Sequence, residues 1–283
     1  MSVSRPQNII GGARIVPTST YAGGVWNLGE VGFYKSYYEV NYGTSYSKYP
    51  WPTNMITRGL IGYWDANNTA SYPGTGTTWS DLSGNGYTGT LTNGPTYTSN
   101  NGGGIVLDGV NDYVTTTYTA AIGNNFTVAA WCYPTAVGQS VGSEVVHKAY
   151  SATTNSFGID YLSTSKFRFG TINNTTGSTV TGATTCSINN FYYVALSFGG
   201  DASDKTIRGY INYQNNMIND ALLTNANNPS FNASYAVNFG TFVPSPANNY
   251  WTGNIYAVQL YNVSLTENEI QTNFDAMRGR FGI

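Results

Sequence analysis

The chain reads GLIGYWDANN over residues 59–68, WSDLSGNGYTGTL over 79–91 and GGGIVLDGVNDYV over 102–114. Short apolar runs bounded by glycine and polar clusters are typical of β-strands. Residues 83–86, Ser-Gly-Asn-Gly, tolerate positive φ, and the Asp81 carboxylate is close enough in sequence to accept N–H bonds from that turn. The region therefore predicts short strands separated by tight turns.

The rest of the chain continues this pattern, with turn signals about every ten residues, as in a sandwich or jelly roll. Residues 126–132 alternate so that Phe126, Val128, Ala130 and Cys132 face one side and Trp131 the other. Apolar groups on both sides predict an inner strand of a sheet that is covered on both faces. Further strands are predicted over residues 144–148, 156–161, 166–171, 192–198, 206–211 and 237–242, and polar loops over 173–182 and 215–232.

One helix is predicted near the C-terminus. Thr266 and Glu269 have the spacing of a capping box, and Leu265 and Ile270 that of a hydrophobic staple. The helical face carries Ile270, Phe274 and Met277, and Gly279 is expected to end the helix. We expect this face to dock on the edge of the sandwich.

Several motifs occur in a characteristic order. GLIGYW, DLSGNGYTGTL (81–91) and LDGVNDYV (107–114) are followed by FTVAAW (126–131), YYVALSF (192–198) and WTGNIYAVQLYN (251–262). Together they resemble the laminin-G-like branch of the concanavalin-A-like lectin/glucanase superfamily, although Leu107 and Asn111 stand where that family often has Phe and Asp. The resemblance covers residues 57–283. It implies an all-β jelly-roll sandwich of two antiparallel sheets with a short C-terminal helix, and it does not specify a function.

Residues 1–56 share no pattern with the sandwich and are rich in Gly and Tyr. We interpret them as an extended N-terminal docking arm that becomes ordered on a partner, and residues 57–283 as the laminin-G-like domain. Tyr and Trp offer a large contact area at low entropic cost. The candidate docking residues are Tyr34, Tyr37, Tyr38, Tyr42, Tyr46, Tyr49 and Trp51. The alternative is an arm that folds back over its own sandwich.

Composition excludes some classes of partner. Only 9% of the residues are charged and the net charge is −2, so no basic stripe is present and nucleic acid is not an expected partner.

No apolar run has the length of a membrane span, and the start, MSVSRPQNIIGG, has no signal-peptide pattern, so ordinary secretion is not expected. Cys132 and Cys186 are expected to be free, half-buried thiols.

The acidic residues do not predict catalysis. The resemblance to glucanases implies an E-x-D-x-x-E cluster on one strand, because retaining hydrolysis needs two carboxyl groups about 5 Å apart. Of the glutamates here, Glu144 is solitary in sequence, and Glu267 and Glu269 belong to the predicted helix. The one histidine, His147, lies beside Lys148 and is expected to be a surface residue. We therefore expect a protein that is not an enzyme.

Two kinds of binding site are implied by the resemblance. Many relatives bind calcium at a rim loop, and Asp108, Asn111 and Asp112 offer suitable oxygens, although the same residues also suit a tight turn. No other cofactor is expected. Glycan recognition by aromatic and amide groups is the second implication, and its candidate residues are Asn173, Asn174, Asn215, Asn216 and Tyr250.

These features favour a structural protein of a virus particle, such as a bacteriophage fibre, baseplate or head-decoration component. Its arm would contact other virion proteins, and its lectin-like domain would face a host surface glycan. The alternative is a carbohydrate-binding adhesin module that is secreted or on the bacterial cell surface. A homo-oligomer, a trimer by analogy with phage fibres, is also expected.

Overall fold

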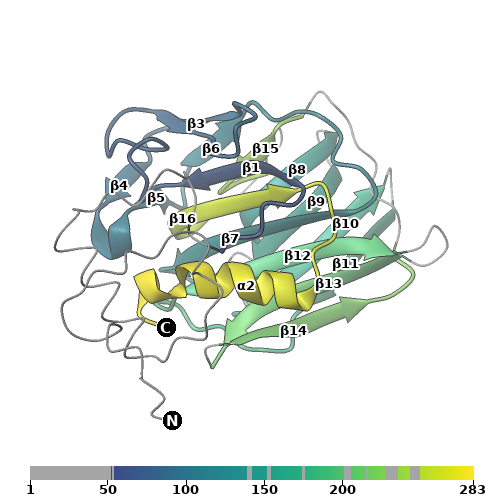
Figure 1. Cartoon of the computed structure of the whole chain (residues 1–283). Helices are drawn as coiled ribbons and strands as arrows, with labels where there is room; N and C mark the ends of the chain where they lie inside the picture. The colour runs from purple at the N-terminus through teal and green to yellow at the C-terminus, as the bar shows by residue number, and fades with distance from the viewer. Residues whose placement is uncertain are drawn as a thin grey trace, which may run out of the picture. The chain divides into compact units, whose positions relative to one another are not determined.

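The structure is a computed structural model that describes residues 52, 54–138, 142–151, 154–173, 176–200, 205–214, 216–226, 235–242 and 249–283. Its strands form two antiparallel sheets, here called sheet A and sheet B, of eight strands each (Figure 1). Sheet A has the order β14-β13-β12-β7-β16-β5-β4. Its eighth strand, β1, pairs with the second half of β16, whereas β5 pairs with the first half. Sheet B has the order β11-β10-β9-β8-β15-β6-β3-β2. The all-β fold predicted from the sequence is confirmed.

The bounds of the elements follow the motifs closely. Sheet A contains β1 (Leu60–Asp65), β4 (Thr96–Thr98), β5 (Gly104–Asp108), β7 (Phe126–Pro134), β12 (Tyr192–Gly200), β13 (Lys205–Tyr213), β14 (Asn216–Leu223) and β16 (Thr252–Tyr261). Sheet B contains β2 (Thr78–Ser80), β3 (Thr88–Thr92), β6 (Tyr113–Thr116), β8 (Ser143–Ser151), β9 (Thr154–Tyr161), β10 (Phe167–Asn173), β11 (Thr176–Thr181) and β15 (Val237–Phe239). The helical elements are η1 (Asn100–Gly102), α2 (Glu267–Met277) and η2 (Arg278–Phe281).

The Asp81 turn is tied to the first strand. Asp81 Oδ1 accepts the N–H groups of Tyr63 and Ser83 at 2.8 Å each, and its Oδ2 accepts the Ser83 hydroxyl at 2.7 Å. The predicted local bonds of this carboxylate are therefore present. The same carboxylate also fixes the turn to β1, a contact that turn chemistry alone does not predict.

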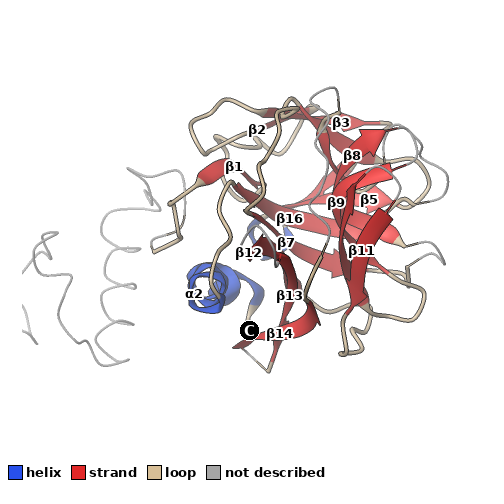
Figure 2. Ribbon diagram, turned by 90° about the vertical axis from the view of Figure 1, so that its right-hand side faces the viewer, coloured by secondary structure: helices blue, strands red, loops and turns tan. Residues whose placement is uncertain are grey.

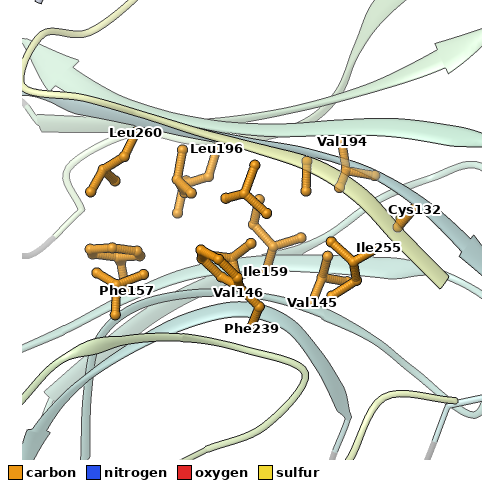
Figure 3. Close-up of a cluster of buried hydrophobic side chains, with 14 of the residues drawn as sticks. Cys132, Val145, Val146, Phe157, Ile159, Val194, Leu196, Phe239, Ile255 and Leu260 are labelled. Carbon is orange, nitrogen blue, oxygen red and sulfur yellow. The ribbon is translucent and has the colours of Figure 1, made fainter. Parts of the chain in front are cut away.

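The main core lies between the two sheets. Figure 3 shows Cys132, Val194, Leu196, Ile255 and Leu260 of sheet A facing five side chains of sheet B, namely Val145, Val146, Phe157, Ile159 and Phe239. Cys132 and Cys186 are both free, as predicted, but both are fully buried rather than half-buried. Their thiols fill core space as small apolar groups.

A second core lies on the other face of sheet A, beneath α2 (Figure 2). Trp131 of β7 stacks on Phe274 of α2 and Phe281 of η2, with ring centroids 5.5 Å and 4.1 Å apart. Trp131 points away from the core that holds Cys132, as the alternation of β7 requires. The prediction of an inner strand covered on both faces is confirmed.

The helix forms where the sequence places it. The Thr266–Glu269 capping box is complete, and Ile270, Phe274 and Met277 are buried on one face. The predicted stop at Gly279 is wrong. This residue lies inside η2, and the left-handed residue that follows the helical segment is Gly282, at φ 72°.

Two predicted loops contain strands. Residues 173–182 include β11, and residues 215–232 include β14. Both are edge strands. β11 has mostly polar side chains, and the apolar residues of β14 do not alternate because the register shifts at Asp220, so neither sequence shows the alternation that marks inner strands. On the free edge of β14, the Met217 N–H donates to Gln271 Oε1 of α2 at 2.7 Å, and the Asp220 carbonyl accepts the Ala183 N–H at 3.1 Å.

The predicted domain boundary at residue 56 stays a prediction, because residues 1–51 and residue 53 lie outside the described part. Within it, Met55 is buried in the second core, and the Ile56 N–H donates to Asn273 Oδ1 of α2 at 2.8 Å. Packing on the sandwich therefore begins by Met55.

Phe274→Ala should lower the free energy of unfolding by about 3–5 kcal/mol, because it leaves a cavity between α2 and Trp131. Urea unfolding followed by tryptophan fluorescence measures this. Leu222→Ala, at an exposed position of β14, should change the free energy of unfolding by less than about 0.5 kcal/mol. A similar small effect for Phe274→Ala would contradict the second core.

Candidate functional site

One polar residue or glycine from each strand forms a continuous row across sheet B. The strand register pairs these residues one after another, and they alternate with core-facing neighbours such as Val114, Phe239, Ile159 and Phe169. The row therefore lies on the sheet face opposite the main core. We call it the polar row; its members are Thr78, Thr90, Thr115, Asn238, His147, Gly158, Gly170 and Thr179.

No helix or strand among the described residues covers this face of sheet B, whereas α2 covers the corresponding face of sheet A (Figure 2). The threonine ends of the polar row are exposed or half-exposed, while Asn238 and His147 in the middle are buried. The Phe242 ring contacts the His147 ring edge-on, with centroids 4.5 Å apart. The polar row is thus open at both ends and covered at its centre.

A second row, here called the charged row, runs beside the polar row. The register pairs Glu144 of β8 with Asp160 of β9, and Asp160 with Arg168 of β10. Arg168 donates to Asp160 Oδ2 through Nε at 3.1 Å and through Nη2 at 2.8 Å. Glu144 is 3% exposed and Asp160 6%, so two buried carboxyl groups lie near one guanidinium, which is partly exposed and pairs with Asp160.

Burial sets the ionisation of the charged row. Desolvation raises the pKa of Glu144 well above its usual value, and the negative charge of Asp160 adds to this effect. Desolvation also raises the pKa of Asp160 to about 6, although Arg168 opposes that shift. Asp160 accepts both guanidinium bonds, so Arg168 directly stabilises the ionised form of Asp160.

The predicted calcium residues form a closed turn. Asp108 Oδ1 accepts the N–H groups of Val110 at 2.8 Å and Asn111 at 3.3 Å, and the Asp108 N–H donates to Asp112 Oδ2 at 3.2 Å. The N–H bonds from Val110 and Asn111 lower the pKa of Asp108. Within the described ranges, no three acidic, His or Cys side chains come close enough to hold a metal ion. The turn fits its local bonding role, and calcium binding stays a prediction.

The predicted glycan residues are spread over different elements. Asn216 is exposed at the start of β14 in sheet A, and Asn173 ends β10 in sheet B. Tyr250 is half-buried and near Tyr113 of β6, so burial and the Tyr113 phenol both raise its pKa. Asn174 and Asn215 lie outside the described residues, as do the docking residues Tyr34, Tyr37, Tyr38, Tyr42, Tyr46, Tyr49 and Trp51. Nothing in the structure tests these roles.

The prediction of a surface position for His147 is wrong. His147 and its neighbour Lys148 are both fully buried, on opposite faces of β8. Lys148 Nζ donates to the carbonyl of Thr119 at 2.9 Å and to the carbonyl of Tyr235. These partners are remote in sequence, so the local pattern gave no sign of them. Desolvation lowers the pKa of Lys148 to about 8.

Sequence reasoning missed both rows. The alternation of exposed and buried residues within a strand can be seen in the sequence; in β3, for example, it places Thr90 and the core residue Leu91 on opposite faces. The pairing of Thr90 with Thr115, or of Glu144 with Asp160, depends on strand register between distant segments. Arg168 was also missed, because a single arginine in a strand has no distinctive spacing.

Known proteins agree with this architecture. Residues 108–271 match the family model of the concanavalin A-like lectin/glucanases superfamily. No curated protein matches the chain in sequence. In the part of the chain that the structure describes, no helix is both long and apolar enough to cross a membrane.

Solved structures share the fold at low identity. Domain 4 of AbnA, a GH43 extracellular arabinanase from Geobacillus stearothermophilus in complex with arabinotriose, has a TM-score of 0.57 at 17% identity, covering 77% of this chain and 98% of that one. The binding domain of Botulinum neurotoxin DC in complex with SialylT has a TM-score of 0.56 at 12% identity, covering 78% and 52%. Trypanosoma rangeli sialidase in complex with sialic acid has a TM-score of 0.53 at 16% identity, covering 78% and 33%.

Lys148→Met should change how stability depends on pH. The pKa of Lys148 is lowered to about 8 in the folded protein, against about 10.4 in an unfolded chain. Above pH 8 the unfolded chain therefore holds more protons, so the wild-type free energy of unfolding gains about 1–2 kcal/mol from pH 8 to 9.5 relative to Lys148→Met. Urea unfolding at both pH values measures this difference.

Lys166→Met is the control, because Lys166 donates to the Ala183 carbonyl at an exposed site. It should follow the wild type across the same pH range. Parallel pH profiles for the wild type and Lys148→Met would contradict the buried ammonium group.

Proposed function

This chain belongs to the concanavalin A-like lectin/glucanase superfamily, and from that premise we propose that it is a non-enzymatic virion structural protein that displays a glycan-binding domain. The observation that carries the glycan-binding part is the set of exposed threonines in the polar row, on the face of sheet B that no described helix or strand covers. The virion part depends on the layout of the sequence, in which a Tyr/Gly-rich segment precedes the sandwich domain.

The polar row suits a polyhydroxylated ligand. Threonine hydroxyls can both donate and accept hydrogen bonds, which matches the hydroxyl groups of a sugar. The accessible hydroxyls lie at the ends of the polar row, with Thr78, Thr90 and Thr115 at one end and Thr179 at the other, while Gly158 between them is buried. The end that holds Thr78, Thr90 and Thr115 presents three hydroxyls from adjacent strands, and it is the part of the face that a sugar could contact directly.

Two structural relatives support a carbohydrate ligand. The arabinanase domain was solved with arabinotriose and the neurotoxin binding domain with SialylT. The arabinanase domain is matched over 98% of its length, so its complex supports sugar binding by this architecture, whereas the neurotoxin chain is matched over 52% of its length. Each shares the fold with this chain rather than specific residues.

The acidic residues favour binding over hydrolysis. Glycoside hydrolysis needs two carboxyl groups that reach the glycosidic bond from opposite sides. Glu144 and Asp160 face each other in register on sheet B, and both are buried, with Asp160 paired to Arg168. Carboxyl groups in that state do not reach a substrate on the sheet surface.

Low charge and a tyrosine-rich N-terminal segment favour a virion component. A chain with 9% charged residues that is rich in Tyr, Asn and Thr suits packing against other proteins. Other virion proteins would be the partners of the segment 1–56, and a phage fibre, baseplate or head decoration would be the location. The second candidate is a bacterial cell-surface or secreted adhesin module, for which the same glycan-binding face would serve.

Thr90→Arg and Thr115→Arg should each weaken glycan binding at least about tenfold, because a long cationic side chain would fill the polar row. A panel of immobilised oligosaccharides identifies the ligand, and titration calorimetry then compares the variants. Thr96→Arg, at an exposed position of β4 in sheet A, is the matched control and should bind like the wild type. Unchanged binding by both sheet-B variants would place the ligand elsewhere.

A chain that begins at Pro52 should not be incorporated into virus particles, because it lacks the proposed docking residues. Met55 is retained in this chain since it packs in the second core. Mass spectrometry of purified particles measures incorporation, and thermal unfolding checks that the shortened chain is folded. Equal incorporation of the shortened and the full-length chain would contradict docking through the N-terminal segment. A cleaved leader upstream of residue 1 would instead favour the second candidate, a bacterial adhesin module.

A further inference from the structure

One end of the polar row presents three hydroxyl groups that the fold itself does not use. Thr78 of β2, Thr90 of β3 and Thr115 of β6 are neighbours in register, so adjacent residues are separated by one strand spacing, about 4.8 Å. Thr78 and Thr90 are exposed and Thr115 is half-exposed. Within the described part of the chain, none of the three hydroxyls takes part in a hydrogen bond. Each can therefore donate to a ligand and accept from it.

An aromatic ring lies beside these hydroxyls. Tyr113 is two residues before Thr115 on β6, and Val114 between them is buried in the main core. Tyr113 and Thr115 therefore share the outer face of sheet B, about 7 Å apart along the strand. Tyr113 is half-buried but belongs to neither hydrophobic core, and Tyr250 lies near it. The face of an aromatic ring carries partial negative charge, which attracts the C–H groups of a sugar ring.

The sequence around this end carries no positive charge. No Lys or Arg occurs between Arg58 and Lys148, a stretch that contains β2, β3 and β6. The charged residues that adjoin these strands are acidic, because Asp81 directly follows β2 and Asp112 directly precedes β6. Asp108, in the same turn as Asp112, is exposed and accepts two N–H bonds that stabilise its ionised form.

The cations elsewhere on sheet B do not supply the missing charge. Lys148 of β8 faces the main core, where it donates to two backbone carbonyls. Arg168 lies on β10, four strands and about 19 Å from β6, and pairs with Asp160 at 2.8 Å. Among the described residues, no cation on sheet B is thus placed to pair with an anionic ligand at the β2–β3–β6 end of the polar row.

We propose that the β2–β3–β6 end of the polar row is a subsite for an uncharged sugar ring, which stacks on Tyr113 and bonds to the hydroxyls of Thr90 and Thr115, and that it discriminates against sialylated, sulfated and uronic-acid glycans. An anionic group would lose water there without gaining a cationic partner, and the neighbouring carboxylates would repel it. The inference rests on the proposed glycan-binding function and specifies the class of glycan.

Matched pairs of glycans test the charge preference on the full-length chain. Neutral oligosaccharides are immobilised on an array, each beside its sialylated, sulfated or uronic-acid counterpart, and titration calorimetry measures the pairs for which binding is seen. The neutral member should bind at least about tenfold more tightly than its charged counterpart. Its affinity should also stay the same between about 0.02 M and 0.5 M salt, because no ion pair contributes to binding.

Two substitutions of Tyr113 test the stacking surface. Tyr113→Ala should weaken the neutral ligand by about three- to tenfold, and Tyr113→Phe, which keeps the ring, should bind within about twofold of the wild type. Tyr133→Ala is the matched control, since Tyr133 is a half-buried tyrosine on the outer face of sheet A, where it packs against Phe191. It should bind like the wild type, and thermal unfolding checks that each variant is folded.

The outcomes separate this subsite from the proposed function. A charged glycan that binds as tightly as its neutral counterpart, or binding that weakens with salt, would overturn the preference for uncharged sugars and leave glycan binding in place. Wild-type affinity in Tyr113→Ala, or equal loss in Tyr113→Ala and Tyr113→Phe, would overturn stacking on this ring. If neither class of glycan binds the array, the glycan-binding function is wrong and the subsite with it.

Discussion

Strand β7 carries apolar side chains on both faces, so sheet A needs an apolar layer on each side. Sheet B supplies one layer against Cys132, and α2 with η2 supplies the other against Trp131. The short C-terminal helix is therefore part of the core rather than an appendage. The helix α2 packs on sheet A, and within the described residues no helix or strand packs on the outer face of sheet B. Polar side chains can therefore line up on that face of sheet B.

The sequence predicted those elements whose signal is local. The alternation of residues 126–132 identified β7 and the opposite orientation of Trp131, and the spacing of Thr266 and Glu269 identified the start of α2. Edge strands β11 and β14 were missed because neither sequence alternates regularly between apolar and polar residues, and pairing with a neighbouring strand places each of them in its sheet. Local chemistry defines inner strands and caps, whereas edges depend on what lies beside them.

The candidate site could not be predicted for a related reason. Each residue of the polar row is ordinary within its own strand, and only the register of eight strands aligns them. The buried charges show the same limit. Glu144 and Lys148 are charged residues of the kind that usually lie on a surface. Glu144, however, pairs in register with Asp160 of the next strand, and Lys148 donates to carbonyl groups on distant loops. Polar residues can be buried when remote parts of the chain satisfy them.

The side-chain and backbone bonds on the free edge of β14 have a consequence for how copies of this protein meet. An unpaired strand edge is a template on which a second chain can add a strand. At Met217 and Asp220 that template is already occupied, by Gln271 of the helix and by Ala183. Copies of this domain are thus protected from joining into a continuous intermolecular sheet along β14, so crowding many of them on one surface would not by itself drive fibrous aggregation through this edge.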